Sequence, residues 1–115
     1  VTITGEESVK EAANRLLKGN TNHLPVIDSE NRLIGIVTTF DISKAFARDE
    51  EDQKVSEIMT RSVITALPDE PVDLAARRLQ VNNIGALVVI DTSKKVLGML
   101  NSYDLCDLVG ERWHK

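Results

Sequence analysis

The chain has 115 residues, of which 42% are hydrophobic, and its 14 basic and 18 acidic residues give a formal net charge of −4. This length favours one compact domain, although two very small interlocked units would also fit. The acidic balance and the scattered basic residues argue against a nucleic-acid binder, which needs clustered basic charge. No apolar run approaches the roughly 20 residues that span a bilayer, so we expect no membrane contact.

The single cysteine, Cys106, excludes an intrachain disulfide and is typical of a reducing compartment. No secretory segment is visible, and we therefore expect a cytoplasmic protein. Val1 begins inside a strand-like pattern, which favours a piece of a longer protein. Cys106 lies in an apolar pattern and is expected to be a small half-buried hydrophobe, because no His–acid pair accompanies it as it would a nucleophile.

The first half of the chain alternates between strand-like and helix-like patterns. Ser8, followed three residues later by Glu11, has the spacing of a capping box and predicts the start of a helix. Gly19-Asn20 has the composition of a helix end. The elements expected, in chain order, are a strand over 1–4, a helix from Ser8 to Gly19, a strand over 24–27, a polar turn over 28–32, a buried strand over 33–41 and a helix from Ile42 to about Arg48.

The junction between that last strand and helix carries the most polar chemistry. The apolar run from Leu33 ends in a Thr-Thr-Phe-Asp sequence over 38–41, and an apolar helical pattern follows from Ile42. The first backbone N–H groups of a helix have no partner inside the helix, and Asp is favoured at such a start. A hydroxyl and a carboxylate beside a helix N-terminus also suit a small-molecule site. Thr38 and Asp41 are therefore candidates for both roles.

A polar, acidic segment over 49–54 is expected to be a solvated linker, and Val55–Thr60 a helical turn or two. The pattern then restarts with a strand over 62–66, a Pro-led helix start over 68–71, a helix ending at Asn82-Asn83, strands over 86–90 and 96–102, and a helix over 103–110. The predicted organisation is a first motif over 1–48, a linker with a short leading helix over 49–61, and a second motif over 62–115, which together form one globular module.

The two halves are copies of one strand–helix–strand–strand–helix unit. Residues 1–47 align with residues 64–110 without a gap, at an offset of 63. One such unit buries too little surface to be stable alone. We therefore predict an α/β (α+β) layered domain, in which two β-α-β-β-α units pack through their sheets about a pseudo-twofold axis with helices outside. Identical pairs include Val9/Val72, Ala12/Ala75, Ala13/Ala76, Arg15/Arg78, Leu16/Leu79, Asn20/Asn83, Leu24/Leu87, Val26/Val89, Ile27/Ile90, Asp28/Asp91, Gly35/Gly98 and Asp41/Asp104.

The sequence resembles a pair of CBS motifs, a Bateman module. The resemblance rests on Asn22–Asp28 followed by Gly35–Asp41, and on Ile58–Thr60 ahead of the second set of strands. Glu57–Arg61 and Asp69–Val72 resemble archaeal versions, and such pairs are often appended to a larger enzyme. The resemblance implies a regulatory module that binds S-adenosylmethionine, methylthioadenosine, AMP or ATP and transmits occupancy to an attached or partner protein. It also implies a homodimer.

The resemblance further implies two ligand clefts between the motifs. In each, the Asp of a Gly-x-x-Thr-x-x-Asp run accepts hydrogen bonds from ribose hydroxyls, the Thr lies near the 5′ substituent, and adenine enters an apolar slot of the other motif. The first cleft would comprise Thr38, Asp41, Met59, Ile64, Ile84, Gly85 and Ala86. The second would comprise Val1, Thr21, Asn22, His23, Asn101 and Asp104.

Departures from the family pattern make the two clefts unequal. Asn101 stands where the pattern has Thr, and the segment that would line the second cleft ahead of Val1 lies outside the sequence. Val88 stands where the first motif has Pro25, which alters the slot of the first cleft. We therefore expect the cleft beside Asp41 to be the better binder.

The charges near the expected 5′ group bear on the ligand. Gly85 and Ala86 carry no cation there, whereas a polyphosphate favours Arg or Lys donors. The first cleft therefore favours S-adenosylmethionine or methylthioadenosine. His23 could serve a phosphate, so AMP and ATP stay open for the second cleft.

Each candidate also has a plainer explanation. Asp41 and Asp104 could be helix caps only, Thr38 could simply fill a strand, Met59 could belong to the core, and His23 could be a turn residue. A structural dimerisation module with empty clefts is the alternative function, since Ile42/Phe46 and Leu105/Val109 offer apolar helix faces for an interface. An enzyme is not expected, because no nucleophile–base pair, metal cluster or phosphate-binding Gly-rich loop is visible, and no cofactor is implied.

Overall fold

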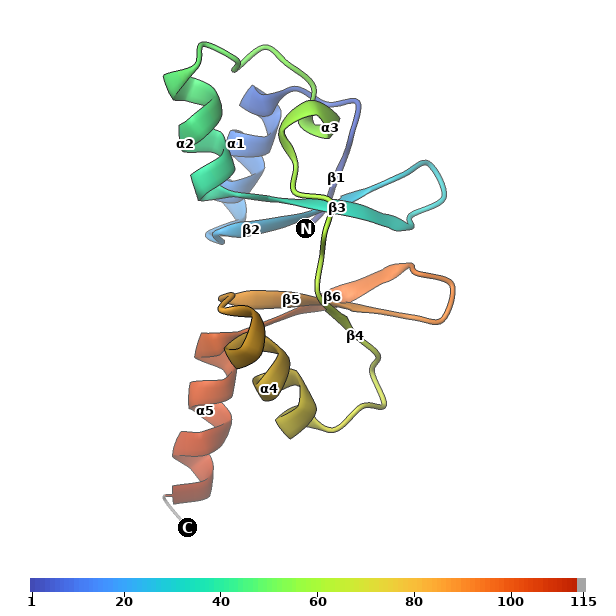
Figure 1. Cartoon of the computed structure of the whole chain (residues 1–115), viewed down its shortest axis with the longest axis vertical. Coiled ribbons are helices and arrows are strands. Elements are labelled where there is room, and N and C mark those ends of the chain that lie inside the picture. Colours follow the sequence, from blue (N-terminus) through green and yellow to red (C-terminus); the bar gives the residue numbers. More distant parts are fainter. Residues whose placement is uncertain (114–115) are drawn as a thin grey trace.

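The computed structural model describes the backbone of residues 1–113 and the side chains of residues 1–107. Two three-stranded sheets, ordered β1-β2-β3 and β4-β5-β6, lie in the middle of the molecule, and the helices lie on their outer sides (Figure 1). The elements are β1 Ile3–Thr4, α1 Val9–Gly19, β2 His23–Ile27, β3 Leu33–Thr38, α2 Thr39–Ala47, α3 Val55–Ile58, β4 Thr65–Ala66, α4 Val72–Asn82, β5 Ala86–Ile90, β6 Val96–Asn101 and α5 Ser102–Trp113.

The sequence repeat is also a repeat of strand pairing. In each half the first strand runs parallel to the second, and the second runs antiparallel to the third. Ile3 pairs with Val26, and Ala66 pairs with Val89 at the same offset along the chain. The predicted α/β fold, with two β-α-β-β-α units packed through their sheets, is therefore confirmed.

The first helix of each half begins and ends as its residues dictate. At the start of α1 the Ser8 hydroxyl oxygen accepts a hydrogen bond from the Glu11 N–H at 3.1 Å. The helices α1 and α4 end on Asn20 and Asn83, whose φ angles of 50° and 51° lie in the left-handed region. Asn tolerates this conformation better than most residues, so it stops both helices at the same position of the repeat.

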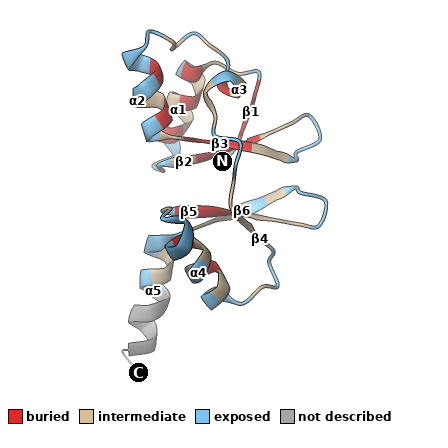
Figure 2. Cartoon of the chain, viewed as in Figure 1, coloured by how far each residue is buried: buried red, intermediate tan, exposed pale blue. Residues whose placement is uncertain are grey.

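Each half has its own hydrophobic core between its sheet and its helices (Figure 2). The second core comprises Ala66, Ala75, Leu79 and Leu87. The first core comprises Ile3, Ala12, Leu16, Leu24, Val26, Val37 and Val55. Val55 belongs to α3, beyond the first motif, and its N–H donates to the Glu7 carbonyl at 2.8 Å. The segment that follows the first motif therefore packs back onto it.

The two sheets contact each other through alternate residues of their strands. Successive strand residues point to opposite faces, and Pro25 lies between two residues of the first core, as Val88 lies next to Leu87 of the second. Pro25 and Val88 are both fully buried, which places them in the layer between the sheets. At the hairpin end, the Leu33 N–H donates to the Lys94 carbonyl at 2.9 Å and joins the halves there.

Several predicted bounds and the predicted burial of one residue need correction. The helix α2 begins at Thr39, three residues earlier than predicted, because Thr38 is its N-cap and Asp41 lies inside the first turn. The strands predicted over 1–4 and 62–66 are reduced to Ile3–Thr4 and Thr65–Ala66. Cys106 is exposed rather than half-buried.

Candidate functional site

Thr38 and Asp41 form a reciprocal capping box at the start of α2. The Asp41 oxygen Oδ2 accepts hydrogen bonds from the Thr38 N–H at 2.9 Å and from the Thr38 hydroxyl at 3.1 Å. The Thr38 hydroxyl oxygen in turn accepts from the Asp41 N–H at 3.2 Å. Asp41 is only 7% exposed. None of these bonds ends on Asp41 Oδ1, so capping fixes the carboxylate and leaves one of its oxygens for a further donor.

The equivalent junction of the second motif keeps the backbone arrangement with different chemistry. Asp104 Oδ2 accepts from the Asn101 N–H at 3.0 Å, and Asn101 Oδ1 accepts from the Asp104 N–H at 2.8 Å. An amide oxygen replaces the hydroxyl as the cap, so the bond from the Thr38 hydroxyl to the carboxylate has no counterpart. Asp104 is also less buried than Asp41.

Residues predicted for different clefts meet where the motifs adjoin. His23 pairs with Thr38 in the first sheet. A Cβ atom added at Gly85 would lie 3.7 Å from His23 Cε1 and 3.9 Å from His23 Nε2. Partial burial lowers the pKa of His23 below its ordinary value, which favours the neutral imidazole. Asn22 and Gly85, at one position of the repeat, accept hydrogen bonds through their carbonyls from the first N–H of α2 and α5, at 3.1 and 3.0 Å.

A cavity of about 270 Å³ lies between the motifs on the side of β6. It brings together three predicted second-cleft residues, Val1, Thr21 and His23. Asn22, Asn101 and Asp104 do not line it. The remaining lining residues, which the sequence did not single out, are Thr2, Gly19, Pro25, Val96, Leu97, Gly98 and Met99.

The predicted first-cleft residues are distributed over both motifs. Met59 packs against the first core, whereas Ile64 and Ile84 pack against the second. Ala86 is buried and Gly85 is exposed. A cavity of about 230 Å³ beside the segment that leads into β4 includes none of the predicted residues; its lining residues are Leu33, Ile34, Arg61, Val63, Thr65, Ile90 and Lys94.

The family model described as CBS domain matches residues 1–48 and 55–111. The chain belongs to the CBS-domain family. It contains two CBS motifs in tandem and is therefore a CBS pair. Among the described residues of this pair, no group of three or more His, Cys, Asp or Glu side chains is placed to hold a metal ion. Of the described helices, none combines the length and the apolar character needed to cross a membrane.

Two solved structures show how closely the fold is matched. The CBS pair of protein MJ0100, solved in complex with 5′-methylthioadenosine and S-adenosyl-L-methionine, is 42% identical with a TM-score of 0.89, over 97% of this chain and 89% of that chain. The CBS domain protein PAE2072 from Pyrobaculum aerophilum, complexed with AMP, is 26% identical with a TM-score of 0.83, over 91% of this chain and 83% of that chain.

The curated relatives are much longer than this CBS pair. An L-aspartate semialdehyde sulfurtransferase of Methanosarcina acetivorans is 43% identical over 113 residues, which are 98% of this chain and 22% of the relative. A homoserine O-acetyltransferase of Methanohalobium evestigatum is 41% identical over 110 residues, or 96% of this chain and 22% of the relative. The chain thus spans about a fifth of these proteins, and the expected archaeal relationship is confirmed.

The two CBS motifs differ around one glycine of the repeat. A Cβ atom added at Gly35 would lie 2.6 Å from Met59 Sδ and 3.0 Å from the Thr60 carbonyl oxygen, whereas nothing lies within 4 Å at Gly98. Thr60 also pairs with Ile36 at the edge of the first sheet, through N–H to carbonyl bonds of 2.8 and 2.9 Å. The first motif is therefore covered at a place where the second lies open.

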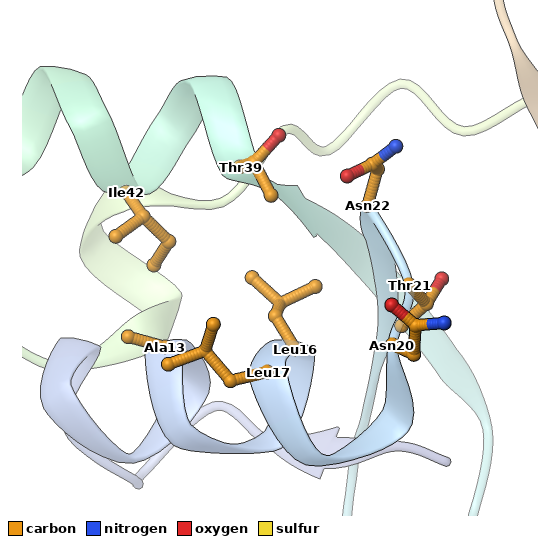
Figure 3. A pocket seen from close by; sticks show the side chains of 8 residues that line it. All are labelled: Ala13, Leu16, Leu17, Asn20, Thr21, Asn22, Thr39 and Ile42. Atoms are coloured by element: carbon orange, nitrogen blue, oxygen red, sulfur yellow. The ribbon is translucent and has the colours of Figure 1, made fainter.

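Each CBS motif also carries a groove on its helical side, which the sequence analysis missed. The groove between α1 and α2 measures about 410 Å³ (Figure 3) and its counterpart between α4 and α5 about 340 Å³. Repeated small and apolar helix positions were the available sign, but such positions also describe a core. The first groove is lined by Ala13, Leu16, Leu17, Asn20, Thr21, Asn22, Thr39 and Ile42, and the second by Ala76, Leu79, Gln80, Asn83, Ile84, Ser102 and Leu105.

Proposed function

We propose that this CBS pair is a non-catalytic regulatory module that binds an adenosine-containing ligand between its motifs and transmits occupancy to the protein that carries it. The observation that carries the proposal is the Asp41 carboxylate, which Thr38 holds in place and which keeps one oxygen outside the capping bonds. A carboxylate that is already ordered loses little entropy when ribose hydroxyls bind it. The complex of the MJ0100 CBS pair with two adenosine derivatives supports the same ligand class.

In the first cleft we assign the ribose to Asp41 and the 5′ substituent to the side of Thr38. Ile64 and Ile84 would form the apolar wall for the purine, and their packing against the second core gives that wall a rigid base. The glycine at 85 has no side chain to block close approach of a flat ring. The remaining proposed contacts of this cleft are Met59, Gly85 and Ala86.

The proposed ligands of the two clefts differ in charge. Gly85 and Ala86 offer no cation for a phosphate, so S-adenosylmethionine or methylthioadenosine is proposed for the first cleft. In the second cleft we propose Thr21, Asn22, His23, Asn101 and Asp104. Burial lowers the pKa of His23 and favours its neutral ring, which attracts a phosphate less strongly than a charged ring would, and we propose AMP or ATP as the weaker candidates for this cleft.

A structural dimerisation module is the second candidate, and one observation favours dimerisation itself. Leu17 and Phe46 are 78% and 71% exposed on α1 and α2, and Leu17 lines the groove between these helices. Apolar side chains exposed on neighbouring helices are typical of an interface. We propose a homodimer through the helical side, which leaves the clefts free for ligand. Light scattering should give a dimer mass for the wild type and a lower mass for Phe46→Ser.

Thermal unfolding with methylthioadenosine, S-adenosylmethionine, AMP or ATP tests ligand binding. A ligand at 100 times its Kd stabilises the folded state by about 2.7 kcal/mol, which corresponds to a Tm increase of roughly 10 °C or more for a domain of this size. Asp41→Asn should lose the increase for the first-cleft ligand, and Asp104→Asn, its matched control, should keep it. No increase with any ligand at millimolar concentration would leave the dimerisation module as the better function.

A further inference from the structure

In each CBS motif an arginine of the first helix binds the strand that leads into the motif. Arg15 of α1 donates through Nη1 to the Thr2 carbonyl at 2.8 Å, and Arg78 of α4 donates through Nη1 to the Thr65 carbonyl at 2.9 Å. Both members of each contact occupy equivalent positions of the 63-residue repeat. A contact that joins residues 13 apart in both copies indicates a role common to the two motifs.

Each arginine is held in turn by a carboxylate at an equivalent position. Arg15 Nη2 lies 2.9 Å from Glu7, whereas Arg78 binds both carboxylate oxygens of Glu70, at 2.8 and 2.7 Å. Glu70 also accepts the Leu67 N–H at 2.7 Å. The Arg78–Glu70 pair therefore holds Thr65 of β4 through its carbonyl and Leu67, the residue after β4, through its N–H. Hydrogen bonds from Arg78 lower the pKa of Glu70 to about 2, so the pair is ionised at neutral pH.

The strand held in this way is preceded by Ile64, which the proposed function assigns to the apolar wall of the first cleft. Thr65 directly follows Ile64, whose carbonyl accepts the Val88 N–H at 3.2 Å. β4 itself has only two residues, so its ladder contributes few hydrogen bonds to keep it in place. The position of Ile64 consequently depends on the Arg78 contact next to it. In the first motif Val1 corresponds to Ile64, because it directly precedes Thr2, whose carbonyl Arg15 binds.

We propose that Arg78 and Arg15 are positioning residues that fix the leading strand, and with it the apolar wall, of the first and second cleft respectively. The effect on ligand affinity rests on the proposed function, whereas the effect on the strand does not. Each cleft takes its apolar wall from one motif and its Asp from the other. Release of β4 should therefore weaken the cleft of Asp41, and release of β1 the cleft of Asp104.

Amide hydrogen exchange of the ligand-free CBS pair tests the strand. Arg78→Lys keeps the charge, but one ammonium cannot replace the planar fork that binds Glu70 and Thr65 together. In this variant the ratio of the Val88 amide exchange rate to the exchange rates of the α4 amides should rise about tenfold above its wild-type value. Arg77→Lys, at the exposed neighbour on the same helix, should leave this ratio unchanged. A uniform acceleration of all amides of the second motif would show general destabilisation and overturn the inference.

Calorimetric titration with methylthioadenosine then tests the cleft. Arg78→Lys should raise the Kd of the Asp41-dependent site about tenfold, and Arg15→Lys should leave that site unchanged. Glu11 is a second carboxylate partner of Arg15, since it accepts a hydrogen bond from Arg15 Nε at 2.9 Å. Glu11→Leu gives the first motif the residue found at position 74 of the second, removes only this contact and should alter neither site. An unchanged Kd in Arg78→Lys would overturn the assignment. If the wild type binds nothing, the proposed function fails, while the exchange ratio still decides whether Arg78 positions β4.

Discussion

One alanine substitution, made at two equivalent glycines, should have opposite effects on stability. Gly35 and Gly98 occupy the same position of the repeat, in β3 and β6. Neither has a positive φ angle, so alanine fits the backbone at both. At Gly35 the new methyl group would lie 2.6 Å from Met59 Sδ and 3.0 Å from the Thr60 oxygen, and at Gly98 it would meet nothing within 4 Å.

The magnitudes follow from these surroundings. The Met59 sulfur at 2.6 Å would have to move, and the Thr60 carbonyl is fixed by its pairing with Ile36, so both contacts oppose the new methyl group and Gly35→Ala should destabilise the fold by about 1–3 kcal/mol. Gly98→Ala removes backbone freedom from the unfolded chain without a clash and should stabilise by about 0.4–1 kcal/mol. At roughly 4–8 °C per kcal/mol, the first variant melts some 5–20 °C lower and the second a few degrees higher than the wild type.

Urea unfolding of the two variants, followed by circular dichroism, measures this difference at constant temperature. A double-mutant cycle with Met59→Ala separates the two contacts, because the part of the cost of Gly35→Ala that comes from the Met59 side chain should disappear in that background while the part from the Thr60 carbonyl stays. A Gly35→Ala variant as stable as the wild type, or equal losses at the two glycines, would refute the reasoning. So would a Met59→Ala background that leaves the cost of Gly35→Ala unchanged.

Three further outcomes are expected. Glu70→Gln should be less stable than the wild type above pH 4.5, and the difference should shrink as the pH falls towards 2. The reason is that the lowered pKa of Glu70 stabilises the fold only while the carboxylate is ionised. Urea unfolding midpoints measured across that pH range check this. His23→Gln should be less sensitive to acid than the wild type below pH 6.5, because burial opposes protonation of the folded imidazole, and Tm values at pH 7.5 and 5.5 check this. Val55→Ala should destabilise by about 2 kcal/mol in urea unfolding, since Val55 is fully buried, whereas Val81→Ala at an exposed position should change stability by less than about 0.5 kcal/mol.

The duplicated sequence was sufficient to predict the fold. Because apolar positions recur at the same offset, each strand or helix predicted in one half is independent support for predicting the same element in the other half. Strand and helix boundaries were less predictable. The Thr-x-x-Asp spacing over 38–41 fits a capping box as well as a strand end, and the helix began at the earlier position because Thr38 rather than Asp41 became its cap.

The site was predictable only where its residues lie close together in the sequence. Thr38 and Asp41 are three residues apart, so one pattern contained both. The contact of His23 with Gly85 depends on how two sheets meet, and no local pattern reports that distance. Arg15 and Arg78 were visible as an identical pair of the repeat, but an arginine on an amphipathic helix is usually solvated, and only the structure shows which carbonyl each one binds.

The position of Val55 in the first core has a consequence for the order in which the chain folds during synthesis. The repeat unit ends before this residue, yet the core of that unit is complete only when α3 has turned back and added Val55 to the cluster that contains Leu16 and Val37. A nascent chain that has reached residue 48 therefore holds an unfinished core, even though every strand and helix of its motif has been made. The first core can be completed only after about ten more residues have left the ribosome, when the segment that begins the second motif is the next to be synthesised.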